Sequence, residues 1–584
     1  MEDFADRIRG VLSRAALRHE QASHGPRRTA REDLVAWARA HLSHKRLLVV
    51  SNREPYSHER GPQGLYWVRN AGGLTVALDS VAQALGGVWT AHGSGGADRL
   101  ASDAAGRVAC PPDHPTYTLK RVWLSEEDQA LYYNGLSNSA LWPLCHIAYV
   151  RPRFRIEEWE RYRDVNRRFA EAVMEEVGDQ AAFVFIQDYH LGLVARFLKE
   201  WRPDLEVALF WHIPWPNVEV FRIFPWKQEL LEGMLANDLV GFHIRHHTQN
   251  FLDAVADVLE ARVDRERGAV ERAGKRTWVR DFPIGVDATE IAAMAEAQVA
   301  REAERRLRAE LGLVDCRVGL GVDRLDYTKG IPERLDGLER MLEKHPEWIG
   351  RFSFIQIGVP SRIGLKEYKD VLLRTRKRVE RINERLPRPA PEGAATAGPE
   401  AEAARAVRGE TPSPAGDSAS RHDGSFLPSG DDRPRRPPPG NAPSTLPTVH
   451  LIERSLDFRE LVPYYRMADL CAVTSLHDGM NLVAKEYIAA TPDLDGALVL
   501  SPFTGAAREL ERAFIASPYD RESMADAYHA ALSEAPESRR ERMAALRETV
   551  LRYNIFDWAI EVLDTVQRLT LRTPQGEAAD APKE

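Results

Sequence analysis

The chain has 584 residues, a formal net charge of −8 at pH 7 and a sequence pI of about 6.2. This length exceeds what one hydrophobic core organises, so at least two domains are expected. The acidic balance disfavours nucleic acid and anionic membrane surfaces as partners, and no apolar run approaches the roughly 20 residues that cross a bilayer. Because the four cysteines also lack paired spacing, we expect a cytoplasmic protein.

The chain opens with a predicted helical extension at 1–45, which holds polar helices at about 3–20 and 31–43. Short apolar runs then predict strands at Leu47–Val50, Phe183–Ile186, Val207–Trp211, Leu239–Phe242, Val318–Val322, Phe352–Ile357, Leu470–Val473 and Ala497–Leu500. Helical patterns separate them at 72–85, 157–176, 191–200, 227–236, 246–260, 332–344, 364–386 and 481–490. This alternation is typical of parallel sheets with right-handed crossovers, and uninterrupted apolar strands indicate burial on both faces.

The elements fall into two groups, with a change-over near Pro283–Ala288. Residues 387–447 are rich in Pro, Gly, Ala, Ser and Arg and have almost no large apolar side chains, so they are predicted to be a disordered insertion. The predicted division is an N-terminal domain at 46–287, a C-terminal domain at 288–386 and 448–550, a C-terminal helix at 551–571 that packs back on the N-terminal domain, and a disordered tail at 572–584.

Charged side chains follow the predicted strands at their carboxyl ends, where open parallel sheets bind ligands. Four of them are the cations Arg53, Arg324, Lys329 and Arg362. Arginine holds phosphate oxygens through paired hydrogen bonds, and lysine acts as a compact point charge. Because these cations divide between both groups of strands, they predict a cleft between two domains. There a group would pass from a nucleotide-activated donor to an anionic acceptor.

The segment Asp478–Tyr487 joins a predicted strand to a helix through a glycine turn. A helix N-terminus offers free backbone N–H groups to an anion. Gly72 and Gly73 open another predicted helix and allow an equally close approach. Lys485 and Glu486 lie one turn into the first of these helices, so we expect them to reach a phosphate or a ribose.

Several short strings together resemble the trehalose-6-phosphate synthase family, in the order that family has them: Ser51-Asn52-Arg53, Ala71-Gly72-Gly73-Leu74, Tyr132-Tyr133-Asn134 with Leu141-Trp142-Pro143, Asp188-Tyr189-His190, His212-Ile213-Pro214, Arg324 to Gly330 and Asp478 to Tyr487. The resemblance covers about 46–386 and 448–570. It implies an α/β fold of the GT-B type, with two Rossmann-like domains whose parallel sheets face each other across a cleft. It also implies transfer of glucose from UDP-glucose to glucose 6-phosphate with retention at the anomeric carbon, giving α,α-trehalose 6-phosphate and UDP.

The resemblance assigns roles position by position. The acceptor and its phosphate would contact Arg53, Tyr133, Trp142, Asp188 and Arg362. The donor would contact Gly72, Gly73, Arg324, Lys329, Asp478, Gly479, Met480, Asn481, Leu482, Val483 and Glu486. The residues expected to act in catalysis are Asp188, His212, Arg324 and Lys329. The resemblance also implies that no covalent intermediate forms. No metal or other cofactor is expected, because Arg324 and Lys329 neutralise the departing diphosphate.

The residues leave alternatives open. Arg53 continues into Glu54-Pro55-Tyr56, a form also associated with glucosylglycerol-phosphate synthases, so glycerol 3-phosphate is the alternative acceptor. A sugar-phosphate sensor without catalysis is another interpretation, and assembly into a homo-oligomer is undecided. The cluster His243, His246 and His247 is expected to be a solvated face, because no carboxylate or cysteine completes a metal site there.

Overall fold

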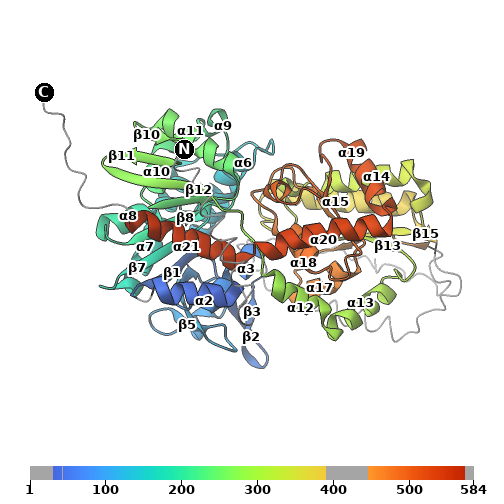
Figure 1. The fold of residues 1–584 in the computed structure, drawn as a ribbon, viewed down its shortest axis with the longest axis horizontal. Helices are drawn as coiled ribbons and strands as arrows, with labels where there is room; N and C mark the ends of the chain where they lie inside the picture. Colours follow the sequence, from blue (N-terminus) through green and yellow to red (C-terminus); the bar gives the residue numbers. More distant parts are fainter. Residues whose placement is uncertain (1–29, 43, 71, 390–444, 572–584) are drawn as a thin grey trace, which may run out of the picture.

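The computed structural model describes the chain at 30–42, 44–70, 72–389 and 445–571. Two domains lie side by side, each built around one sheet with helices packed against it (Figure 1). The predictions for the first 29 residues, for most of the Pro-rich insertion and for the tail fall outside the described residues.

The N-terminal domain is built on a ten-stranded sheet in the order β10-β11-β12-β9-β8-β7-β1-β4-β6-β5. The pairs from β12 to β6 are all parallel, and antiparallel pairs add both edges. The strands are β1 (Arg46–Arg53), β4 (Val88–His92), β5 (Arg107–Cys110), β6 (Tyr117–Val122), β7 (Ala182–Gln187), β8 (Glu206–Phe210), β9 (Leu239–Phe242), β10 (Arg262–Asp264), β11 (Ala269–Arg272) and β12 (Lys275–Asp281). The central parallel strands therefore end at one common edge.

Helices and one hairpin complete this domain. The hairpin of β2 (Tyr56–Gly61) and β3 (Gly64–Arg69) directly follows β1. The helices are α2 (Ala30–His41), α3 (Gly73–Leu85), α4 (Asp98–Ala101), α5 (Glu126–Asp128), the π-helix η1 (Gln129–Leu141), α6 (Trp142–His146), α7 (Ile156–Val177), the 3-10 helix η2 (Tyr189–Leu191), α8 (Val194–Trp201), α9 (Val218–Phe221), α10 (Lys227–Met234) and α11 (Arg245–Val258).

The C-terminal domain has a six-stranded, wholly parallel sheet in the order β17-β14-β13-β18-β19-β20. Its strands are β13 (Arg317–Arg324), β14 (Phe352–Val359), β17 (Val449–Ile452), β18 (Leu470–Val473), β19 (Ala497–Leu500) and β20 (Phe514–Ile515), with the small ladder of β15 (Arg388–Pro389) and β16 (Thr445–Leu446). Its helices are α12 (Ala288–Glu296), α13 (Gln298–Glu310), η3 (Tyr327–Lys329), α14 (Ile331–Lys344), η4 (Pro346–Trp348), α15 (Lys366–Arg385), α17 (Phe458–Met467), α18 (Leu482–Ala489), η5 (Gly505–Arg508), α19 (Arg521–Ser533) and α20 (Pro536–Arg552).

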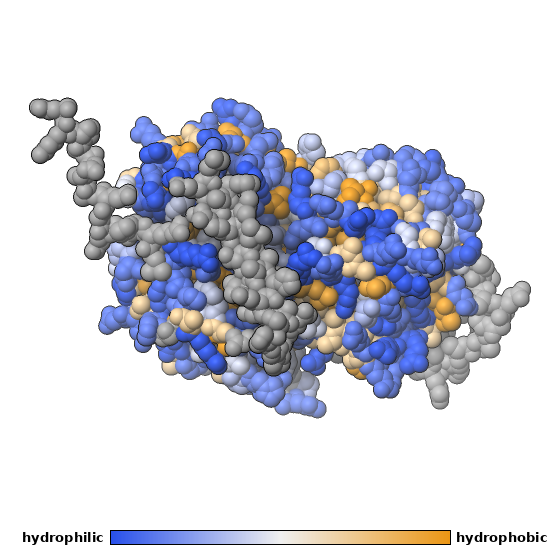
Figure 2. Space-filling model, in the orientation of Figure 1, coloured by the Kyte–Doolittle hydropathy of each residue, from blue (hydrophilic) through white to orange (hydrophobic). Residues whose placement is uncertain are grey.

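The last helix, α21 (Ile555–Leu571), returns from α20 to the N-terminal domain (Figure 1). There it contacts α2, α3 and β8. The Trp558 ring packs edge-on against Phe210 at 5.0 Å between ring centres, and both side chains are fully buried. Within the described residues, no helix combines the length and apolar character needed to cross a membrane. Where grey does not cover it, the face in Figure 2 is mostly hydrophilic, with hydrophobic residues in small groups.

The apolar runs predict several of the inner strands. Leu239–Phe242, Leu470–Val473 and Ala497–Leu500 are β9, β18 and β19 residue for residue, and every residue in them is buried. This confirms the expected burial on both faces for these strands. The same criterion misses the inner strands β4, β6 and β12 and the outer strands β5, β10, β11, β17 and β20. In β6, β10, β11 and β12, charged side chains interrupt the apolar run.

Next to the end of β1, the buried charges of Glu54, Asp98 and Arg121 form a cluster. Arg121 Nε donates to Glu54 Oε2 at 2.9 Å, and Arg121 Nη2 lies 2.8 Å from Asp98 Oδ1. The backbone N–H of Ser94 donates to the other Glu54 oxygen at 2.8 Å. Burial and the Asp98 carboxylate raise the pKa of Glu54 to about 8 despite Arg121, so this carboxyl keeps its proton at neutral pH.

Replacing Glu54 with Gln is therefore expected to change the free energy of unfolding by less than about 1.5 kcal/mol at pH 6, because the amide resembles the protonated carboxyl. Because the pKa of Glu54 is higher in the folded state, proton binding by Glu54 stabilises the fold. This stabilisation is complete below the ordinary pKa of 4.5 and is lost as pH rises towards 8. The wild type should thus lose more stability than Glu54→Gln between pH 6 and pH 9. Urea unfolding of the wild type and of Glu54→Gln at pH 6 and at pH 9 measures these free energies. A loss above about 3 kcal/mol at pH 6 would instead indicate an ionised Glu54 paired with Arg121.

Candidate active site

Arg362, from the C-terminal domain, lies among aromatic side chains of the N-terminal domain. It follows β14 and has a φ of 50°, which non-glycine residues rarely adopt. Its guanidinium carbon lies 5.5 Å from the ring centre of Tyr133 and 4.8 Å from that of Trp142. Arg324, at the end of β13, lies 5.4 Å from the same Trp142 ring. Two cations of one domain thus contact two aromatic residues of the other.

Tyr133 marks the point where the predicted cations converge. It lies in the π-helix η1, and burial alone would favour its neutral phenol. Arg362, Arg53 and Arg324 together outweigh burial and lower the pKa of Tyr133 to about 7. Because Arg53 ends β1 of the N-terminal domain, cations from both domains act on this one group.

Asp188 and His212 lie where β7 and β8 end, on the N-terminal side of the cleft. Asp188 has a φ of 75°, and its Oδ1 accepts hydrogen bonds from the backbone N–H groups of Tyr189 at 2.9 Å and His212 at 3.2 Å. Burial raises the pKa of Asp188 to about 6, although these N–H groups favour the carboxylate. His212 Nε2 lies 2.9 Å from Gln187 Oε1, and burial holds the pKa of His212 well below its usual value. The Asp188 carboxylate is thus fixed by backbone N–H groups, and the neutral His212 ring is oriented by Gln187.

In the C-terminal domain, Asp478 organises the turn after β18. Its Oδ2 accepts hydrogen bonds from Lys329 Nζ, from Ser475 Oγ at 3.1 Å and from Asn481 Nδ2 at 3.2 Å. Burial opposes ionisation, but Lys329 outweighs it and lowers the pKa of Asp478 to about 2. Asn481 has a φ of 72° and directly precedes α18. Lys329 is therefore held at this turn by an ion pair.

The N-terminus of α3 meets that of α18 across the domain boundary. A Cβ at Gly73 would lie 3.3 Å from Glu486 Oε1 and 3.2 Å from Leu482 Cδ1. The preceding Gly72 has a φ of 157°, and a Cβ there would lie 3.8 Å from Arg53 Nη1. Neither helix has a side-chain hydrogen bond at its N-cap, which leaves backbone N–H groups at both starts for an anion.

The remaining residues that the sequence predicts to contact the donor line this turn closely. A Cβ at Gly479 would lie 2.1 Å from the carbonyl oxygen of His212, so the two domains can approach here only at a glycine. Met480 is buried, whereas Leu482 and Val483 are half-buried at the start of α18. Most of the predicted site residues therefore lie at the facing strand ends or at the starts of α3 and α18, whereas Tyr133 lies in η1 and Trp142 begins α6.

Lys485 contradicts the expectation that it reaches a ligand. Its Nζ donates to the carbonyl of Ile284 at 2.8 Å and pairs with Glu509 at 2.6 Å, and the residue is only 2% exposed. The expectation is wrong because α18 turns this position towards the junction of the domains. Its neighbour Glu486 lies at the cleft, where Tyr465 Oη donates to it at 2.7 Å.

The expectation of a solvated histidine face is also wrong for two of the three residues. His243 and His247 are 3% and 2% exposed, and only His246 is exposed. The reason is that the end of β9 and the start of α11 lie against the C-terminal domain, where a Cβ at Gly479 would lie 3.2 Å from His243 Cδ2. His243 lies 5.2 Å from the His212 ring, and His247 lies 5.9 Å from the His477 ring.

Some residues of the site were not singled out from the sequence. Arg362 Nη1 donates to Tyr368 Oη at 2.6 Å and lies 3.6 Å from Asp326 Oδ2. The His190 ring stacks on Tyr133 with centres 5.6 Å apart and planes at 11°. His190 and Asp326 belong to the recognised strings, so the signal for them was present. Tyr368 lies in α15, where nothing in the sequence distinguishes it.

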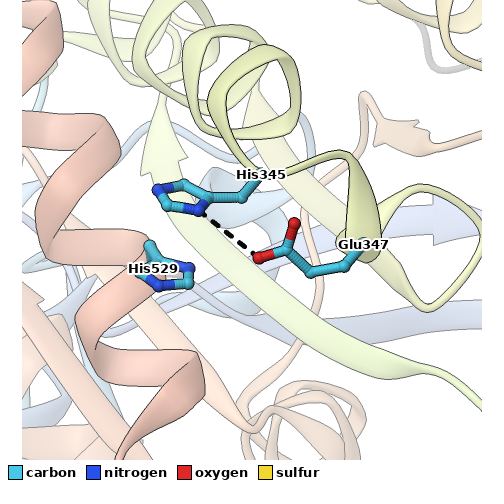
Figure 3. A group of neighbouring side chains, drawn as sticks. All are labelled: His345, Glu347 and His529. Atoms are coloured by element: carbon cyan, nitrogen blue, oxygen red, sulfur yellow. Dashed lines mark ion pairs between the residues drawn. The ribbon is translucent and has the colours of Figure 1, made fainter.

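Away from the cleft, the described part of the chain holds one group with metal-ligand composition: His345, Glu347 and His529 (Figure 3). The two imidazole rings are parallel within 5° and 3.5 Å apart. Their lone pairs lie in the ring planes and so do not converge on one point. Trp348 Nε1 also donates to His529 Nδ1 at 3.2 Å. This geometry fits a stacked, hydrogen-bonded pair better than a formed metal site.

Two Rossmann-like domains, with cations from both gathered at the facing strand ends, define a glycosyltransferase of the GT-B class. The chain belongs to glycosyltransferase family 20, whose model matches residues 45–390 and 442–568. The fold predicted from the sequence is confirmed.

Known proteins similar to this chain agree with that assignment. The trehalose-6-phosphate synthase of Mycolicibacterium gilvum is 37% identical over 532 residues, which cover 89% of this chain and 93% of that protein. A solved structure described as "Trehalose-6-phosphate from E. coli bound with UDP-2-fluoro glucose" has a TM-score of 0.71 at 28% identity and covers 90% of this chain and 99% of its own. An alpha,alpha-trehalose-phosphate synthase (UDP-forming) from Burkholderia xenovorans, in complex with glucose-6-phosphate, has a TM-score of 0.71 at 27% identity over 89% of this chain and 100% of its own.

Proposed function

We propose that this chain transfers glucose from UDP-glucose to glucose 6-phosphate with retention, giving α,α-trehalose 6-phosphate and UDP. The observation that supports it most is the convergence of Arg53, Arg324 and Arg362 on Tyr133, across the boundary between the domains. A phosphorylated sugar needs this density of positive charge, and an uncharged acceptor does not.

The acceptor site lies on the N-terminal side of the cleft. Arg53, Arg362 and the Tyr133 hydroxyl bind the phosphate, and the Trp142 ring packs against the sugar. Asp188, fixed by two backbone N–H groups, accepts a hydrogen bond from an acceptor hydroxyl and orients it. These contacts place the acceptor oxygen towards the donor.

The donor lies on the C-terminal side. The backbone N–H groups at the start of α18 bind the diphosphate, Glu486 binds the ribose, and the turn from Asp478 to Asn481 contacts the glucose next to His212. As the glycosidic bond breaks, Arg324 and Lys329 stabilise the charge that develops on UDP. The departing phosphate oxygen takes the proton of the attacking hydroxyl, and attack on the same face retains the configuration. No covalent intermediate forms.

The proposed reaction needs no metal or other cofactor. The two cations replace a metal ion at the diphosphate, so turnover should continue in excess EDTA. The partners are the two small-molecule substrates, without nucleic acid or membrane. We place the protein in the cytoplasm, which agrees with four free, buried cysteines.

An acceptor panel tests this proposal. UDP release from UDP-glucose should be at least tenfold faster with glucose 6-phosphate than with glycerol 3-phosphate at equal, subsaturating concentration, because only the hexose offers a ring to Trp142 and hydroxyls to Asp188. The reverse order would support the glucosylglycerol-phosphate alternative. Ligand binding without UDP release for either acceptor would support a sensor.

A further inference from the structure

His477, which directly precedes Asp478, makes a hydrogen bond across the boundary between the domains. Its Nδ1 lies 2.8 Å from the carbonyl oxygen of His146, so the ring N–H donates to that carbonyl. His146 is the last residue of α6, the helix that begins at Trp142. Ile147 follows with a φ of 51°, a left-handed residue that ends the helix. His477 thus binds one of the terminal carbonyls that a helix leaves without partners.

Two buried histidines of the N-terminal domain surround this contact. The ring of His477 lies 6.4 Å from that of His146 and 5.9 Å from that of His247. Burial lowers the pKa of all three. A neutral imidazole has one ring proton, and the bond to the carbonyl fixes it on Nδ1 of His477. The contact is therefore a single, directed hydrogen bond.

We propose that His477 is a positioning residue that couples the donor and acceptor subsites. This rests on the function proposed above. On one side, His477 is joined by one peptide bond to Asp478, which holds Lys329. On the other side, it binds the end of the helix that begins at Trp142, whose ring contacts Arg324 and Arg362. Because this hydrogen bond links the two domains, it forms only when the domains are in contact. It then fixes the position of the donor subsite relative to the acceptor subsite.

Two substitutions separate the donated hydrogen bond from the bulk of the ring. His477→Asn keeps an N–H donor near the Nδ1 position, whereas His477→Leu has a similar size and no donor. The matched control is His246→Leu, because His246 is an exposed histidine next to His247. Isothermal titration measures the affinity for glucose 6-phosphate with and without saturating UDP, and steady-state kinetics gives kcat and KM for both substrates.

In the wild type, UDP should tighten glucose 6-phosphate binding. His477→Leu should reduce this effect of UDP about 3- to 10-fold, and it should reduce kcat/KM for the acceptor by the same factor. This is the effect expected from the loss of one hydrogen bond. The affinity for UDP alone should not change, because the donor lies mainly on the C-terminal domain. His477→Asn should restore most of the effect, and His246→Leu should match the wild type.

The positioning role is overturned if His477→Leu keeps the wild-type coupling, or if His477→Asn is as defective as His477→Leu. Should the Leu variant unfold, His477→Ser provides a second variant without the ring N–H, with the same expected loss. A different result would contradict the proposed function itself: the wild type would release no UDP with any acceptor.

Discussion

Replacing Lys329 with Met is expected to lower kcat with UDP-glucose by about 10²- to 10³-fold. In the free protein its ammonium group pairs with Asp478 at the turn after β18, which we propose to bind the donor. During transfer the diphosphate gains negative charge, so a cation fixed at that position stabilises the transition state more than the bound substrate. Initial rates of UDP release at saturating substrates measure the loss. KM for glucose 6-phosphate should change far less than kcat.

The control for this variant is Lys344→Met. Lys344 ends α14, away from the facing strand ends, and pairs with Asp526 at the surface. The same substitution there should leave kcat within about twofold, because exposed ion pairs contribute little. Circular dichroism of both variants shows whether removing the partner of buried Asp478 has unfolded the domain. A folded Lys329→Met enzyme with kcat near the wild-type value would reject the diphosphate role.

Replacing Tyr133 with Phe is expected to remove the alkaline fall of kcat/KM for glucose 6-phosphate. Below its pKa of about 7, Tyr133 is neutral and can donate to the phosphate. Above that pH it is a phenolate, which repels the phosphate dianion and competes for Arg362. The wild type should therefore lose about tenfold per pH unit above 7, reaching roughly 100-fold at pH 9. The Phe variant should lose a few-fold at pH 6 and then stay level.

Tyr368→Phe is the matched control for the pH profile. Tyr368 also contacts Arg362, at 5.3 Å from its ring centre, but burial raises the pKa of Tyr368, so it stays neutral over the assay range. This variant should keep the alkaline fall. If Tyr133→Phe shows the same fall as the wild type, another group titrates and the assignment to Tyr133 is wrong.

The sequence alone predicts much of the architecture, because the burial of a strand is visible in the residue types of that strand itself. Strands covered on both faces are uninterrupted apolar runs, and the charged residues that follow them locate the carboxyl edge of the sheet. The strings from Arg324 to Gly330 and from Asp478 to Tyr487 therefore predict both the turns and the cations. The edge strands β10 and β11 lack such runs, because only part of their surface is covered.

The errors arise where the decisive contact comes from the other domain. Lys485 looks like a ligand residue along α18, yet it binds the carbonyl of Ile284, which is distant in sequence. His247 looks solvated along α11, yet it is buried, with the His477 ring of the other domain 5.9 Å away. No periodicity in one helix reveals what a separate domain places against it, so these residues, like Tyr368, required the assembled fold.

The main chain passes between the domains twice, once after β12 and once between α20 and α21, and the two crossings touch. A Cβ at Gly285 would lie 2.5 Å from the carbonyl carbon of Asn554, and the N–H of Ile555 donates to the carbonyl of Val286 at 3.3 Å. Because the two crossings lie next to each other, they allow one domain to rotate about them but restrict its translation relative to the other domain. If the domains separate to admit substrates, we therefore expect a rotation about these two crossings, and not a translation of one domain along the other.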